Sequence, residues 1–150
     1  FGLWMRALPM SPDKFKYYGW HKSIGSLVLI VAAARFLWRL INKAPKLPSD
    51  MPWYEKAGAD ASHFALYIMM FFMPLIGWAM SSAAGFPVSV FGWFILPAIT
   101  APSPHNVELF KTLHYYGGLF LIALILLHAF AALYHHFWRK DNILKRMLPW

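Results

Sequence analysis

Hydrophobic residues are concentrated in three long segments, which are separated by connectors rich in proline. The segments cover about residues 20–41, 63–84 and 110–138, and none of them contains Asp or Glu. A helix needs about 20 consecutive, predominantly apolar residues to cross the hydrocarbon core of a bilayer. The pattern therefore predicts an all-α membrane protein in which residues 1–150 form a single domain with three full transmembrane spans.

Proline residues mark the connectors, because proline interrupts a regular helix. The connectors after the first and second segments hold, in chain order, Pro45, Pro48, Pro52, Pro87, Pro97, Pro102 and Pro104. The second connector, residues 85–106, is also apolar and aromatic. We expect it to lie in the membrane interface as a short lid or re-entrant piece, since aromatic rings favour that region.

The overall composition supports a membrane location. Hydrophobic residues make up 59% of the chain and aromatic residues 19%, with a mean hydropathy of +0.46. This is more apolar surface than a soluble domain of this size can bury. The net charge is +8, but the basic residues flank the apolar segments and form no separate basic face. That placement favours a lipid bilayer as partner and argues against nucleic acid.

Two further counts narrow the possibilities. The chain has no cysteine, which excludes disulfides, iron–sulfur clusters and covalently attached c-type haem. Residues 35–56 and the C-terminal tail together carry nine Lys and Arg, against five in residues 1–22 and at position 111. Because loops rich in Lys and Arg stay in the cytoplasm, we expect the first connector and the C-terminus to be cytoplasmic.

The seven histidines need an explanation in so apolar a chain, since an imidazole in hydrocarbon requires a partner. His114 and His128 are close to four helical turns apart, so they project from nearly the same face, separated by about 21 Å. His21 begins the first span at the depth of His114. Neutral imidazole is a suitable axial ligand of haem iron. We therefore predict one haem between His21 and His114 and a second haem at His128.

Glycines near these histidines support the haem interpretation. Gly25 follows His21 by one helical turn, and Gly117 and Gly118 follow His114, so that a flat macrocycle could approach the backbone. The second ligand of the His128 haem stays open. It is either His63, at the cytoplasmic start of the second span, or a histidine on an upstream helix that this chain lacks. The simpler alternative for any single membrane histidine is a packing role.

Other polar residues allow two interpretations each. Arg35 and Arg39 either anchor the cytoplasmic end of the first span or pair with haem propionates, which suit the geometry of guanidinium groups. His135 and His136 fit interfacial positions, although His135 shares a face with His128 and could contact a haem edge or a quinone. His105 lies in the proline-rich connector and is expected to be solvated.

Several short motifs, taken in order, resemble the bacterial cytochrome b561 family of the inner membrane. The resemblance covers essentially the whole chain and rests on residues 20–25 (WHKSIG), Arg35 to Arg39, residues 80–89 (MSSAAGFPVS), the spacing of His114 and His128, and residues 135–136 (HH) to 147–149 (MLP). It implies a transmembrane four-helix bundle with two b haems. His21 and His114 would hold one haem. His128 and a histidine near the start of a first helix would hold the other; residues 1–8 are interpreted as the tail of that helix.

The resemblance also implies a function. Members of this family are similar to electron carriers coupled to membrane quinones such as ubiquinone, and superoxide is one candidate donor. Lys14, Lys16 and Lys22 could attract such an anion to the outer haem. With two protein ligands on each iron, no position is open for oxygen. Two alternatives remain: a haem-bearing membrane anchor for a dehydrogenase or hydrogenase partner subunit, and a non-haem transporter or structural subunit.

Overall fold

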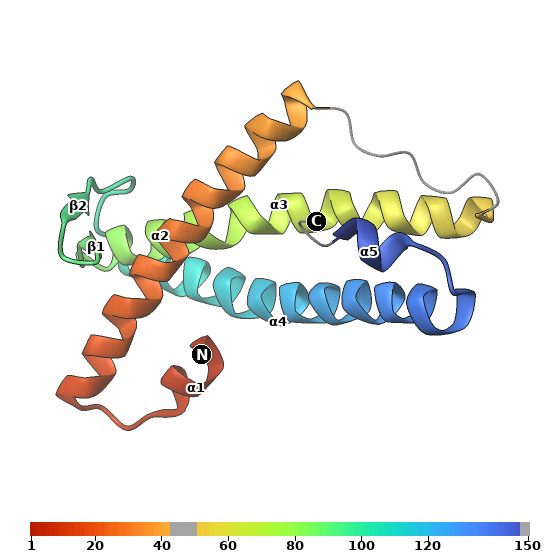
Figure 1. Cartoon of the computed structure of the whole chain (residues 1–150). Helices are drawn as coiled ribbons and strands as arrows, with labels where there is room; N and C mark the ends of the chain where they lie inside the picture. The colour runs from red at the N-terminus through yellow and green to blue at the C-terminus, as the bar shows by residue number, and fades with distance from the viewer. Residues whose placement is uncertain (43–50, 148–150) are drawn as a thin grey trace.

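The computed structural model describes residues 1–42 and 51–147, with side chains as far as Lys145, and it is almost entirely helical (Figure 1). The elements in chain order are α1 (Gly2–Ala7), α2 (Pro12–Ile41), α3 (Trp53–Ala83), β1 (Val88–Val90), β2 (Phe94–Leu96), α4 (Pro104–Tyr134), η1 (His135–Arg139) and α5 (Ile143–Met147). The segment η1 is a π-helix that continues α4. The all-α prediction is confirmed, with one small hairpin added. Pro45 and Pro48 lie outside the described residues.

Three helices within the described residues are long and apolar enough to cross a membrane, judged by length and composition: Pro12–Ile41, Trp53–Ala83 and Pro104–Arg139. Each begins well before the span predicted from hydrophobicity. The extensions of α2 and α4 have a local cause. Ser11 accepts a hydrogen bond from the Lys14 N–H at 3.2 Å, and Ser103 accepts one from the Asn106 N–H at 3.3 Å. Each serine is followed by a proline, so both helices start on a capped, pre-formed first turn.

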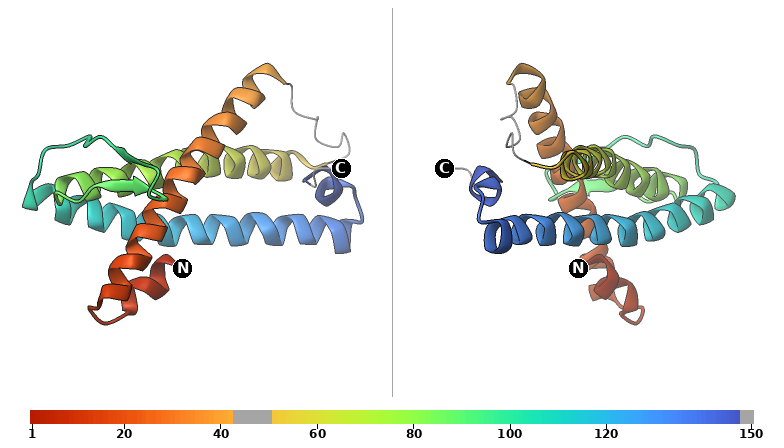
Figure 2. Two further views of the ribbon diagram at one scale, coloured as in Figure 1. Left: turned by 60° about the vertical axis from the view of Figure 1, so that its left-hand side comes forward. Right: turned by 90° about the vertical axis from the view of Figure 1, so that its right-hand side faces the viewer.

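The arrangement of the three long helices is asymmetric. Helices α3 and α4 lie side by side along most of their length, whereas α2 crosses α3 at a steep angle (Figures 1 and 2). Both α2 and α4 pack on α3, and over their lengths α2 and α4 do not pack on each other. Helices α3 and α4 are closely packed at Gly117, where a Cβ would lie only 2.8 Å from Met73 Sδ. Since α2 and α4 do not pack on each other, these two helices can meet only through side chains.

A β-hairpin forms part of the second connector. Strand β1 pairs antiparallel with β2, with Val88 opposite Leu96. The turn between them places Phe91 at φ 51° and Gly92 at φ 78°, and the Trp93 N–H donates to the Val90 carbonyl at 3.0 Å. Positive φ at both central residues is typical of a type I′ hairpin turn. The sequence predicted only an irregular lid or re-entrant piece here, because three-residue strands are too short to leave an alternating pattern.

The hairpin is attached to α2 by hydrogen bonds, of which those of Ser23 are partly buried. Ser23 Oγ accepts from the Phe91 N–H at 3.0 Å and lies 2.9 Å from the carbonyl of Ser89, to which it can donate. Lys22 Nζ donates to the carbonyl of Pro87 at 2.8 Å. These bonds satisfy backbone groups that would otherwise be left unpaired at the edge of a very short sheet.

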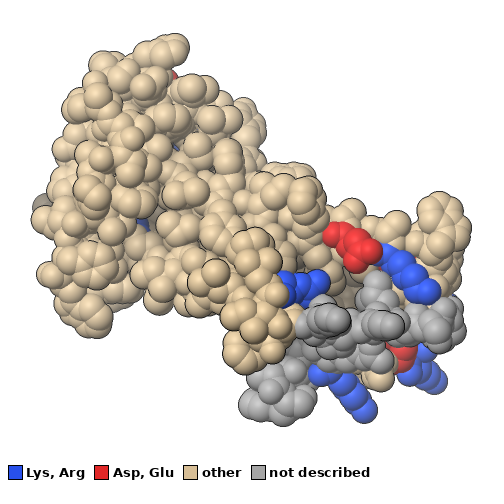
Figure 3. Space-filling view, turned by 90° about the horizontal axis from the view of Figure 1, so that it is seen from above, with Lys and Arg blue, Asp and Glu red and all other residues tan. Residues whose placement is uncertain are grey.

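The surface of the molecule is mostly apolar, with many large hydrophobic side chains exposed along the three long helices. Charged side chains visible in Figure 3 gather toward the end of the molecule where α3 begins and α4 ends. The rest of that face shows few of them. This asymmetry agrees with the uneven distribution of Lys and Arg along the sequence.

Candidate functional site

His21 on α2 and His114 on α4 come together across α3. Their ring centroids are 5.9 Å apart, and the ring planes make an angle of 85°. A histidine nitrogen binds a zinc ion at about 2.0–2.1 Å, so two axial nitrogens on one metal of similar size lie about 4 Å apart and their ring centres somewhat further. The observed separation therefore fits two ligands of a single iron. Both rings are only partly exposed.

The surroundings of this pair differ on its two sides. A Cβ on Gly25 would meet no described atom within 4 Å, apart from its chain neighbours and its own helix, so this side of α2 stays open. The expectation for Gly117 is wrong. Met73 occupies the space that a side chain on Gly117 would take. Gly117 therefore lets α3 and α4 approach each other and offers no room for a macrocycle. Gly118 faces Met73 Cε at 3.6 Å, an ordinary van der Waals contact.

A second pair of histidines lies toward the other end of α3 and α4. The rings of His63 and His128 have centroids 5.2 Å apart and planes at 66°. Arg35 and Arg39 on α2 are near enough to His63 to act on it electrostatically, and both are exposed. The structure thus brings together His63 and His128, the pair that the sequence left open.

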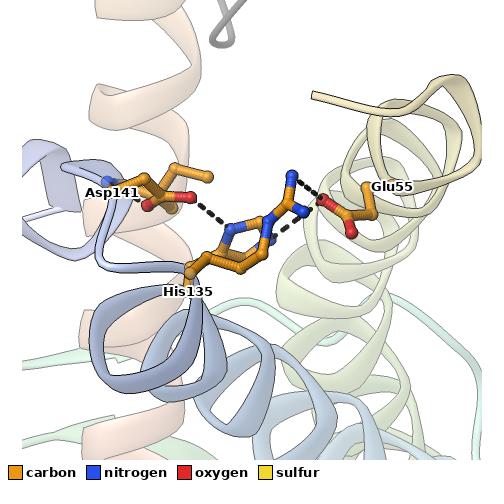
Figure 4. Close-up of polar contacts among 5 residues, drawn as sticks. Glu55, His135 and Asp141 are labelled. Carbon is orange, nitrogen blue, oxygen red and sulfur yellow. Dashed lines mark hydrogen bonds and ion pairs between the residues drawn. The ribbon is translucent and has the colours of Figure 1, made fainter. Parts of the chain in front are cut away.

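A polar cluster forms where α3 begins and α4 ends (Figure 4). His135 is only 9% exposed, and its Nδ1 lies 2.6 Å from Asp141 Oδ2. Its Nε2 lies 3.8 Å from Glu55 Oε2, and Arg139 Nη2 lies 3.6 Å from the same oxygen. Glu55 Oε2 is buried and has no hydrogen-bond partner among the described residues. His135 is therefore no simple interfacial side chain; it bridges two carboxylates.

The carboxylate of Asp141 is stabilised in its charged form. Burial acts against ionisation, but the Ile143 N–H and the His135 ring bond to the carboxylate and Arg139 adds a favourable charge. Together these lower the pKa of Asp141 below its ordinary value. Sequence reasoning missed Glu55 and Asp141. The available signal was their rarity, since only six acidic residues occur in the chain.

The remaining predicted residues have more ordinary surroundings. Lys14 is buried, and its Nζ donates to the carbonyls of Arg6 and Leu8, which holds α1 against the start of α2. Lys22 also binds Ser81 Oγ at 3.2 Å, and Lys16 is exposed. His105 is exposed in the first turn of α4, as expected, while His136 lies against the Phe137 ring with centroids 4.8 Å apart.

Comparison with known proteins matches residues 1–150 to the family described as prokaryotic cytochrome b561. The chain is 41% identical to cytochrome b561 homolog 2 of Escherichia coli K12, over 98% of this chain and 79% of the relative. It is 33% identical to cytochrome b561 homolog 1 of the same organism, over 86% of this chain and 73% of the relative. It is 31% identical to a probable superoxide oxidase, CybB, of Yersinia pestis, with the same coverage of 86% and 73%. The match over the whole chain, together with the helices and histidines described above, shows that this protein is a membrane cytochrome of the prokaryotic cytochrome b561 family.

Proposed function

We propose that the protein is a di-haem electron carrier in which His21 and His114 hold one b haem. The observation that carries the proposal is the separation of 5.9 Å between two imidazoles from α2 and α4, two helices whose backbones stay apart. Two structural features support the fit. The side of α2 at Gly25 is open, and both imidazoles are only partly exposed. When bound, haem supplies one-electron redox chemistry at its iron, and the protein supplies the ligands and their orientation.

We assign His128 to the second haem, with two candidates for the other ligand. His63 is supported by its ring separation of 5.2 Å from His128. A histidine on a helix outside this chain is supported by the family resemblance. In either case Arg35 and Arg39 are the proposed partners of the propionates of this haem, since guanidinium groups pair well with carboxylates.

Electrons would enter at the His21 end and leave at the end of the molecule where α3 begins. We propose membrane quinone as acceptor near Glu55 and His135, because a buried carboxylate oxygen that makes no hydrogen bond to the described residues, next to an imidazole, suits a ligand that takes up protons when reduced. Superoxide is a candidate donor, which one relative's name supports. Of the three outer lysines, Lys16 is the exposed one that could attract it. The proposed location is the bacterial inner membrane.

The proposal is tested by a reduced-minus-oxidised spectrum with haem quantitation on the full-length protein. We expect two haems per chain, falling to one in His114→Ala and to one in His128→Ala. His63→Ala distinguishes the two candidates: loss of one haem assigns His63 as ligand, and retention of both assigns the ligand to a helix outside this chain. His105→Ala, which changes an exposed histidine on α4, is the matched control and should keep both haems.

The same preparation tests the direction of electron flow. Superoxide should reduce the haems, and added ubiquinone should reoxidise them. A purified protein without a haem spectrum would establish the non-haem alternative. Haem-loaded protein that ubiquinone fails to reoxidise, and that co-purifies with a large soluble subunit, would establish the membrane-anchor alternative.

A further inference from the structure

We infer that Gly77 on α3 is a positioning residue for His114, which it orients as an axial ligand. This inference rests on the proposed function, because it assumes that His114 binds iron. A Cβ built on Gly77 would lie 3.1 Å from His114 Cε1 and 3.4 Å from His114 Nδ1. The first distance is tighter than ordinary van der Waals contact, so a methyl group at this position must push the imidazole away.

The missing side chain also brings the imidazole close to the backbone of α3. His114 Nδ1 is shielded from solvent and makes no conventional hydrogen bond to a described group. The polar group that faces it is the backbone carbonyl of Met73. Met73 lies one helical turn before Gly77, so its carbonyl points along the helix toward the glycine. A Cβ at Gly77 would lie next to the contact between the His114 ring and the Met73 carbonyl.

The chemical consequence concerns the tautomer of His114. A ring N–H directed at a backbone carbonyl fixes which nitrogen carries the proton and how the ring is turned. With Nδ1 directed at Met73, Nε2 is the nitrogen left for iron. Gly77 thus acts through His114 and needs no contact with the haem.

Gly2 on α1 faces the other imidazole in a similar way, since a Cβ on it would lie 3.3 Å from His21 Cε1, but Gly117 and Gly58 face no imidazole. A Cβ on Gly117 would meet Met73. A Cβ on Gly58 would meet no described atom within 4 Å beyond its chain neighbours and its own helix. Gly77 and Gly58 lie on the same helix, so the same substitution at both sites separates the effect on His114 from the general effect of alanine on α3.

The test is Gly77→Ala in the full-length, haem-loaded protein, with Gly58→Ala as the matched control. We expect Gly77→Ala to change the low-spin EPR signal and the midpoint potential of one haem, or to lose that haem, while the His128 haem keeps both properties. Gly58→Ala should leave both haems unchanged. Unchanged potentials and EPR signals in Gly77→Ala, with two haems in the wild type, would overturn the inference and leave the proposed function intact. A wild type without haem would instead refute the proposed function itself.

A second comparison covers the outcome in which Gly77→Ala accumulates poorly and holds no haem. His114→Ala removes the ring that the new methyl group would strike. The double variant Gly77→Ala/His114→Ala should therefore accumulate and keep the His128 haem as His114→Ala alone does. A double variant that still fails would show that Gly77 serves helix packing, and the positioning role would be wrong.

Discussion

Glu55, His135 and Asp141 form a chain of polar contacts around a buried imidazole, and its geometry explains how that imidazole persists in this apolar protein. His135 has a carboxylate on each side, 2.6 Å away at Asp141 and 3.8 Å away at Glu55. Asp141 also accepts from the Ile143 N–H at 3.0 Å, which caps the start of α5. Residue-scale contacts therefore connect the start of α3, the end of α4 and α5.

The lowered pKa of Asp141 predicts how stability changes with pH. An aspartate whose pKa is lower in the folded state stabilises the fold above its unfolded pKa, which is near 3.8, and this contribution is lost as the pH falls through the lower folded value. Because Asp141 is partly exposed to solvent, we expect the effect to be under about 1 kcal/mol. Thermal unfolding in detergent should show that Asp141→Asn is less stable than wild type at neutral pH. The two proteins should converge as the pH is lowered below about 3.8.

Asn142→Ala, next to the cluster, is the control and should follow the wild type at each pH. A difference between Asp141→Asn and wild type that stays constant down to the lowest pH would contradict the assignment, because it could not come from ionisation of this carboxylate.

Sequence patterns point to some of the candidate site residues and not to others. Imidazoles stand out in an apolar helix, so His21, His114 and His128 were identified by residue type and spacing. Glu55 lies outside the predicted spans, and its contact with His135 joins residues 80 positions apart. No local pattern encodes such a contact, and the same holds for Gly77 against His114.

At the scale of elements, the β-hairpin shows how a weak local structure is held in place. Strands of three residues are marginal by themselves. Phe91, a bulky residue, has a positive φ that L-residues adopt at some cost. The hydrogen bonds from Ser23 on α2 supply partners for the Phe91 N–H and the Ser89 carbonyl. The docking of the hairpin on α2 thus compensates for its unfavourable turn.

Ser23→Ala should release the hairpin from α2. The substitution leaves two backbone groups without partners in a buried site, which typically costs about 1–3 kcal/mol for each unsatisfied group. We expect faster hydrogen exchange at residues 88–96 and faster proteolysis within the hairpin, with exchange in α3 and α4 unchanged. Ser26→Ala is the control, since Ser26 Oγ donates to the Lys22 carbonyl of its own helix, at 3.0 Å. Equal exchange in both variants would show that Ser23 does not hold the hairpin.

For the whole molecule, the distribution of charge predicts its orientation in the membrane. Lys145 lies in α5, beside the end of α4, and His105 lies at the opposite end of α4; both are exposed. The natural chain has no cysteine, so each position can carry a single introduced thiol. In intact spheroplasts, a membrane-impermeant maleimide should label His105→Cys. It should label Lys145→Cys only after the membrane is permeabilised, because the Lys- and Arg-rich end is expected in the cytoplasm. The reverse pattern would contradict the predicted orientation.

The sequence by itself determined the class of the protein, its three spans and the residue type of its candidate ligands. Each of these is a local property: apolarity over about 20 residues suffices for a span, and a histidine inside such a span is conspicuous wherever it packs. Only the tertiary structure decided which residues meet. The crossing of α2 over α3 brings His21 to His114. The side-by-side packing of α3 and α4 brings His63 to His128. The π-helical end of α4 turns His135 toward Glu55. These contacts depend on helix crossing angles, which are set by packing between distant residues and leave no trace in the spacing along one helix.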